Sequence, residues 1–266
     1  MNDHPEEDVE VLKELSTTFK YMKGECGHSH DSKLKPRLIY FKKHFTFLSS
    51  YSIPIIAALL EECLKSRRED EVVILCSEIY QVKTVEAALR KIKRTLVTYT
   101  PYLKGEYPED INILKNDAIS NLEAVNTILI SDYRSIRGLE VTHTIIFVDP
   151  QLETSANSLI EAVTRTISNI DIISIKPLSD NPSTSIEKAF QKYSDKQLTI
   201  VTQIETLVAA DQTDIVEVQF TDDASRQSKT IKKQITDSDR NNADSIKELN
   251  ANEELWQNIL RYELEL

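Results

Sequence analysis

Apolar residues along the chain follow two patterns. Some recur at every third or fourth position, which is typical of one face of an amphipathic helix, and others form short continuous runs, which are typical of strands buried on both faces. The first pattern predicts helices at residues 53–65, 80–94 and 157–167. The second pattern predicts strands at residues 71–77, 95–100, 126–132, 143–149 and 171–175. Helices and strands therefore alternate through the middle of the chain.

This alternation indicates an α/β fold. Parallel strands need crossover connections, and the helices in those connections cover both faces of the sheet. We predict one domain of this class over residues 36–178, which is a usual domain size. Residues 1–35 are predicted to form a peripheral N-terminal segment.

The patterns are weaker beyond residue 178. Residues 179–221 predict a mainly helical extension with one strand near its end. Residues 222–250 are polar and lack aromatic residues, which predicts a linker that is at least partly disordered. In residues 251–266, apolar residues recur at three- and four-residue spacing and predict an amphipathic helix. This helix would dock on its own domain or, as the alternative, bind a protein partner.

Composition and charge limit the class of protein. A net charge of −11 over 266 residues argues against a surface that coats nucleic acid, although it does not exclude a local basic groove. Three cysteines, an odd number, favour a reducing compartment over a disulfide framework. The acidic start of the chain is no secretory signal, and no apolar run reaches the roughly 20 residues of a membrane span. We therefore predict an intracellular protein, of the cytoplasm or nucleus, that does not bind membranes.

Polar residues gather in the loop after the predicted strand that ends at Asp132. Arg134, Ser135 and Arg137 occur there, followed by Gly138, one of only four glycines in the chain. Ligands of α/β proteins bind at the carboxyl edge of the sheet. Glycine lets the backbone approach a ligand closely, and the planar fork of arginine suits phosphate. The loop is thus a candidate phosphate-binding site, and the alternative is a purely structural turn.

Three segments resemble motifs of one protein family. Residues 137–150, RGLEVTHTIIFVDP, resemble motif V of superfamily-1 helicases of the UvrD/Rep type, in which a basic residue and Gly-Leu-Glu precede a strand. Residues 160–166, IEAVTRT, are similar to motif VI of that family. Residues 72–90, VVILCSEIYQVKTVEAALR, resemble its motif IV strand and helix. The resemblance covers roughly residues 50–176.

The resemblance implies a RecA-like lobe of the P-loop NTPase fold, the second of two lobes between which ATP binds. It implies that Arg165 acts as an arginine finger on the γ-phosphate when a partner lobe is present, and such a finger contributes roughly 10³–10⁵ in rate in GTPases. The other residues of the implied ATP and nucleic-acid face are Arg134, Arg137, Gly138, Glu140 and Thr164.

The chain also departs from the family pattern. Ile167 stands where motif VI has a second basic residue, Asp132 where motif V has threonine, and Ser77 where motif IV has arginine. The phosphate loop G-x-x-x-x-G-K-[ST] is missing, because the glycines occur only at positions 24, 27, 105 and 138. A first lobe, with its ATP and Mg²⁺, would have to be supplied by a phosphate-loop-bearing partner.

These observations predict a degenerate or truncated helicase second lobe that does not hydrolyse ATP alone. The alternative is a non-enzymatic protein-interaction scaffold derived from a helicase lobe. In that case Arg165 would only pair with Glu161, four residues earlier on the same helix, and Glu140 with Arg137.

No metal site is predicted. Asp149 ends an apolar strand as a metal-binding acid would, but Pro150 follows it instead of a second acid. A weaker alternative for the whole chain is a nucleotide-binding protein of another α/β family, with Asp149 at its site. Cys26, His28 and His30 are zinc-type ligands, yet a structural zinc site needs four, so a polar segment is the favoured interpretation.

Overall fold

The computed structural model describes residues 36–65, 72–103, 127–136, 141–151, 156–163, 166–194, 200–207 and 214–264. The strands in these segments are β1 (Arg37–Phe41), β2 (Val72–Cys76), β3 (Thr95–Tyr99), β4 (Thr127–Asp132), β5 (Val141–Val148), β6 (Thr166–Ser174), β7 (Ile200–Thr206), β8 (Ile215–Asp222) and β9 (Gln227–Gln234). The helices are α2 (Ser52–Lys65), α3 (Ile79–Lys91), α5 (Ala156–Val163), α6 (Ser185–Ser194) and α7 (Asp237–Leu264). Among these helices none has the length and apolar character needed to cross a bilayer.

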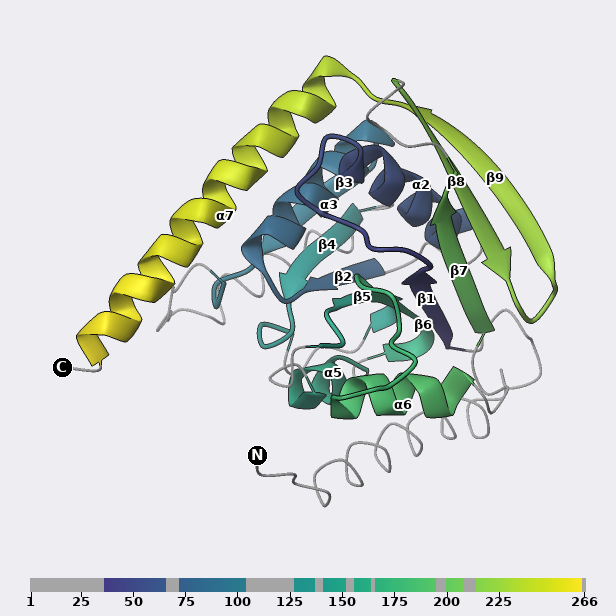
Figure 1. Cartoon of the computed structure of the whole chain (residues 1–266), viewed down its shortest axis with the longest axis horizontal. Helices are drawn as coiled ribbons and strands as arrows, with labels where there is room; N and C mark the ends of the chain where they lie inside the picture. Colours follow the sequence, from purple (N-terminus) through teal and green to yellow (C-terminus); the bar gives the residue numbers. More distant parts are fainter. Residues whose placement is uncertain are drawn as a thin grey trace.

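All nine strands belong to one sheet, in the order β3-β4-β2-β5-β6-β1-β7-β8-β9. The first seven run parallel to one another, and β8 and β9 are added in antiparallel fashion. The helices α2 and α3 cover one face, and α5 and α6 cover the other (Figure 1). The predicted α/β class with helices on both faces is therefore confirmed.

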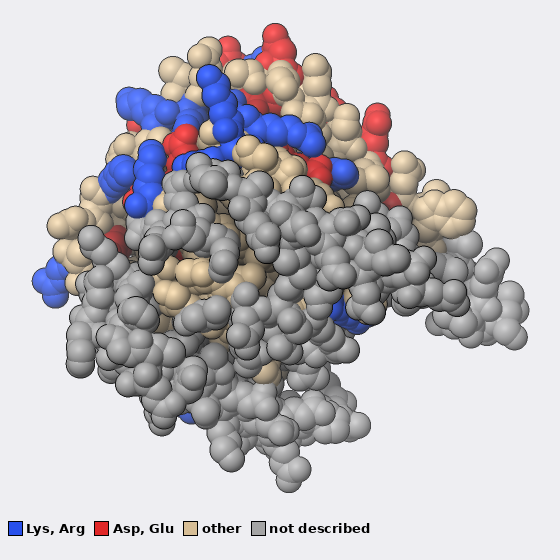
Figure 2. Space-filling model, turned by 180° about the vertical axis from the view of Figure 1, so that it is seen from behind, with Lys and Arg blue, Asp and Glu red and all other residues tan. Residues whose placement is uncertain are grey.

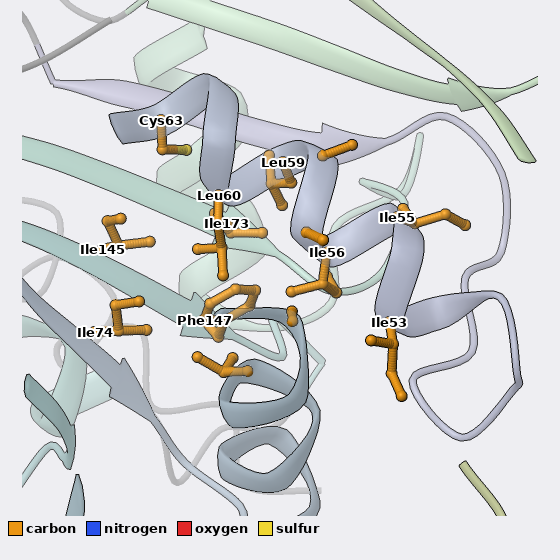
Figure 3. Close-up of a cluster of buried hydrophobic side chains, with 14 of the residues drawn as sticks. Ile53, Ile55, Ile56, Leu59, Leu60, Cys63, Ile74, Ile145, Phe147 and Ile173 are labelled. Atoms are coloured by element: carbon orange, nitrogen blue, oxygen red, sulfur yellow. The ribbon is translucent and has the colours of Figure 1, made fainter. Parts of the chain in front are cut away.

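The larger core lies between the sheet and α2. Figure 3 shows the side chains of Ile56 and Leu60 near Phe147 of β5, and all three are fully buried. In addition to the parallel strands, α2 contacts α3, α7 and the antiparallel strands β8 and β9 of the same sheet. A helix with neighbours on several sides must be apolar nearly all round, which explains its run of consecutive apolar residues from Ile53 to Leu60.

The segment after residue 178 differs from the prediction. Residues 200–206, predicted to be helical, form the strand β7, which pairs with the free edge of β1. Residues 222–250, predicted to be a partly disordered linker, form β9 and the first half of α7. Pairing with β8 provides hydrogen-bond partners for the backbone of β9. Ala243 and Ile246 are buried on the inner face of α7. A segment with few apolar residues is therefore ordered by these contacts.

The motif VI region also differs from the prediction. The helix predicted for residues 157–167 ends at Val163, and β6 starts at Thr166 instead of residue 171. Parallel pairing with β5 explains the longer strand, because Val141 pairs with Thr166 and the hydroxyl of Thr166 donates to that of Thr144 at 2.7 Å.

Candidate functional site

Most residues of the predicted ATP and nucleic-acid face lie outside the described residues. Those are Arg137, Gly138, Glu140, Thr164 and Arg165. The exception is Arg134, which is exposed in the turn after β4. The strands that follow these residues, β5 and β6, are described, so the structure defines where each of the two strands begins.

The ends of β5 and β6 lie side by side. Val141 directly follows Glu140, Thr166 directly follows Arg165, and these two strand residues pair with each other. Val141 and Thr166 are the first residues of two parallel strands. The residues that end the two motifs, Glu140 and Arg165, are therefore each followed by a strand that begins at the amino edge of the sheet. Arg134 instead follows the carboxyl end of β4. The predicted site was placed at the carboxyl edge of the sheet. In the structure Arg134 follows that edge, whereas the residue after Glu140 begins β5 at the opposite edge.

Asp132 holds the turn at the carboxyl end of β4. It is 3% exposed, and its Oδ1 accepts hydrogen bonds from the backbone N–H groups of Arg134 at 3.0 Å and Ser135 at 2.9 Å. Its Oδ2 accepts the hydroxyl of Ser135 at 2.6 Å. Burial raises the pKa of Asp132, and these hydrogen bonds offset part of the rise. The carboxylate that stands in the motif V threonine position is thus used by the fold itself, as in an Asx turn.

Asp149, the residue considered as a metal ligand, is also engaged. Its Oδ2 forms an ion pair with Lys176 Nζ at 2.7 Å, and its Oδ1 accepts the backbone N–H of Gln151 at 2.9 Å. Within the parts of the chain that the structure describes, no group of three or more His, Cys, Asp or Glu side chains could hold a metal ion. The residues Cys26, His28 and His30 lie outside these parts.

Ser77 and Gln81 organise the start of α3. The backbone N–H and the hydroxyl of Ser77 donate to Gln81 Oε1 at 3.0 and 3.2 Å. The residue in the motif IV arginine position therefore positions a buried amide instead of presenting a charge. The amide Nε2 of Gln81 is buried without a hydrogen-bond partner.

Among the residues that the structure describes, those at the carboxyl edge carry excess negative charge. Glu78, the N-cap residue of α3, is half-buried, and its pKa is raised first by burial and then by Glu253 of α7 and by Asp149. Burial also raises the pKa of Glu253. The charges of these acids, and of Asp132, are opposed at this edge by Lys176 and by the exposed Arg134. This edge is a poorer environment for phosphate than the sequence predicted.

Sequence reasoning missed a buried charged cluster near the amino end of the sheet. Arg37 of β1 binds Asp171 of β6 through two hydrogen bonds, from Nε at 2.7 Å and from a terminal nitrogen at 2.9 Å. His143 of β5 contacts the same carboxylate through Nε2 at 2.9 Å, and its Nδ1 is buried without a partner. Burial alone would raise the pKa of Asp171, but the charge of Arg37 and the contact with His143 hold it well below the usual value. The sequence signal that could have indicated this cluster is that Arg37 and Asp171 each stand next to an apolar run.

Lysines and arginines gather on the side of the molecule where β8 and β9 lie, and acidic residues are interspersed among them (Figure 2). The contacts explain the mixture. Lys229 and Lys233 pair with Glu62 and Glu61 of α2 at 2.7 and 2.9 Å, and Lys232 pairs with Glu217. These lysines are largely neutralised by their neighbours, which makes this surface a weak candidate for a nucleic-acid groove.

Neither a protein-family model nor a curated protein matches the sequence. The solved structures with a similar fold include the following two. One is the C-terminal domain of a possible DNA helicase from Lactobacillus plantarum WCFS1, with a TM-score of 0.40 and 11% identity over 71% of this chain and 95% of that one. The other is the C-terminal domain of the DEAD-box protein Dbp5, with a TM-score of 0.44 and 13% identity over 66% of this chain and 92% of that one.

Proposed function

We propose that the chain is a helicase-type second lobe that keeps part of an ATP and nucleic-acid face and works only with a phosphate-loop-bearing lobe. The observation that carries this proposal is the pairing of Val141 with Thr166. Because these residues directly follow the Gly-Leu-Glu loop and the Thr-Arg motif, the pairing supports a joint role of the two motifs at one ligand.

The division of labour follows from the residue types. Arg165 is the residue whose charge would stabilise a γ-phosphate, whereas Arg137 and the backbone at Gly138 would contact ATP or the nucleic-acid backbone. Arg134 follows the opposite edge of the sheet, where it would contact nucleic acid only. The chain has no phosphate loop, so the pure protein should not turn over ATP, with or without single-stranded nucleic acid. Steady ATP hydrolysis that disappears in Arg165→Ala would contradict the need for a second lobe.

The nucleic-acid part of the proposal is tested by binding of labelled single-stranded RNA and DNA across a salt series. We expect affinity to fall with salt, and Arg137→Ala to reduce the slope of log K against log salt by about 0.7, one phosphate contact. Arg226→Ala is the matched control, because Arg226 is equally charged but exposed in the turn between β8 and β9. An equal loss in both variants would mean general electrostatic attraction instead of a site.

A second candidate is a protein-interaction scaffold derived from such a lobe. The contacts of Asp132 favour this second function, since its carboxylate accepts hydrogen bonds from Arg134 and Ser135 and so stabilises the turn that follows β4. If neither RNA nor DNA binds the full chain even at low salt, and no ATP analogue binds, this second function is the better account.

A further inference from the structure

The helix α7 is fastened to α3 at its first half. Lys91, in the last turn of α3, donates to Asp239 Oδ2 at 2.6 Å and to the carbonyl of Gln234 at 3.1 Å. Ala243 and Ile246 are 1% and 4% exposed. An ion pair and an apolar contact therefore hold the same half of the helix.

The start of α7 is also capped. The backbone N–H of Thr236 donates to Asp239 Oδ2 at 2.8 Å, and the N–H of Asp239 reaches the hydroxyl of Thr236 at 3.3 Å. This reciprocal arrangement is a capping box with aspartate in the place of glutamate. The first half of α7 consequently has local as well as tertiary support.

The second half of α7 meets α3 through like charges. At 1.5 Å per residue, Glu253 lies about 21 Å along α7 from Asp239, and Glu78 lies about 20 Å along α3 from Lys91. The two helices contact each other and run side by side in Figure 1, so the Lys91–Asp239 pair at one end brings Glu253 to Glu78 at the other. Glu253 is half-buried, and its Oε2 is buried without a hydrogen-bond partner.

No cation compensates this pair within the described residues. The charged group that faces Glu78 besides Glu253 is Asp149, whose own charge is met by Lys176. On α3 the nearest lysine in sequence, Lys83, pairs with Glu86 at 3.3 Å. The remaining titratable neighbours of Glu78 are Tyr80, Tyr133 and Cys76. Burial raises the pKa of Tyr80 to about 12 and that of the other two as well, so they carry no charge at neutral pH.

We propose that α7 is a two-part latch, whose first half stays docked on α3 while its second half docks when the Glu78–Glu253 pair holds a proton and loosens when both carboxylates are charged. Loosening uncovers the start of α3. The exposed Leu255 and Trp256 move with the second half, since they lie two and three residues after Glu253 in the same helix. The latch does not depend on the proposed function, because it needs only the contact between the two helices.

The direction of the response follows from the pKa shifts. Both glutamates have a pKa raised above 4.5 in the docked state, so docking is complete at low pH and weakens as pH rises from 4.5 through the raised values. While one proton is released, the docking equilibrium falls by up to about tenfold per pH unit.

Hydrogen exchange on the full chain between pH 5 and 8 tests the latch, with rates converted to protection factors so that the intrinsic pH dependence of exchange is removed. We expect protection of residues 249–258 to fall with rising pH by up to about tenfold per unit, and that of residues 240–246 to change little. Glu253→Gln should keep the second half protected and remove most of the pH response. Glu254→Gln, the same change at the exposed neighbour, should respond like the wild type.

A second variant tests the pairing itself. Glu78→Gln should have the same effect as Glu253→Gln, and the double variant should add little to either, because both changes remove one repulsion. Far-UV circular dichroism at each pH establishes that every variant is folded. A flat wild-type profile, an unchanged response in Glu253→Gln, or independent effects of the two substitutions would each overturn the latch.

Discussion

At the scale of single residues, Asp171 has the largest effect that the structure predicts. It is fully buried between Arg37 and His143, and its negative charge compensates the positive charge of the buried Arg37. Removing one partner of a buried ion pair costs about 3–5 kcal/mol, because the other charge is left without compensation.

We therefore expect Asp171→Asn to lower the free energy of unfolding by about 3–5 kcal/mol in urea titrations. The double variant Arg37→Met, Asp171→Asn should be more stable than Asp171→Asn alone, since the uncompensated charge of Arg37 is then removed from the cluster. Asp180→Asn, at an exposed position, should change stability by no more than about 0.5 kcal/mol. A loss in Asp171→Asn as small as in this control would mean that the cluster is hydrated.

The same residue sets part of the acid sensitivity. The folded pKa of Asp171 lies well below its usual value of 3.8, so its stabilising effect is present above pH 3.8 and is lost as pH falls toward the folded value. Between pH 3.8 and 2.5, unfolding titrations of the wild type should lose up to about 1.4 kcal/mol per pH unit more than those of Asp171→Asn. Parallel curves for the two proteins would contradict the pKa direction.

Lys93 carries local backbone strain. Its φ of 58° is in the left-handed region, and it follows the C-cap of α3, where its N–H bonds the carbonyl of Arg90 while the N–H of Arg94 bonds that of Leu89. This is a Schellman motif with lysine in the position that usually holds glycine. Lys93→Gly should raise the free energy of unfolding by about 0.5–1 kcal/mol. Lys83→Gly, inside the same helix, should lower it by about 1 kcal/mol.

At the scale of secondary-structure elements, the docking of α7 depends on the half-buried ion pair between Lys91 and Asp239, whose side chains are 20% and 4% exposed. Lys91→Ala should cost about 1–3 kcal/mol, because it leaves the Asp239 carboxylate and the Gln234 carbonyl with one bond fewer. Lys247→Ala removes an exposed pair on the same helix and should cost under about 1 kcal/mol. Equal effects would show that α7 is held by its apolar contacts alone.

Elements with a local signal were predicted well, and elements that depend on distant partners were not. The strand β2 was recognised because it is a complete apolar run, and the helix α3 because its own residues show the helical period. By contrast, β1 starts with a charged residue whose partner is on β6, and β9 is polar because its lysines meet acids of α2 and β8. No pattern inside these two segments shows those contacts.

The candidate site follows the same rule. The turn after Asp132 was predicted from its residue types, and the structure describes that turn. The use of the carboxylate within the turn, and the approach of Glu253 to Glu78, depend on geometry that no spacing in the sequence records. The roles of Arg137, Gly138, Glu140, Thr164 and Arg165 remain predictions.

At the scale of the whole molecule, β1 joins the two parts of the sheet. It pairs with β6 on one side and with β7 on the other, so the antiparallel β7–β9 unit is continuous with the parallel part. We expect one cooperative unfolding transition in urea, with the same midpoint by far-UV circular dichroism and by near-UV circular dichroism of the ten tyrosines. Two separated midpoints would mean that β7–β9 and α7 unfold independently of the rest.

The central position of β1 has a consequence for the nascent polypeptide. Arg37 leaves the ribosome before its partner Asp171, which follows 134 residues later, and before the flanking strand β7, which follows later still. At roughly 5–20 residues per second, that interval lasts about 7–27 s, during which an apolar strand waits without its neighbours. Chaperones that bind short exposed apolar segments would have their best opportunity here, and a slower translation rate would lengthen it.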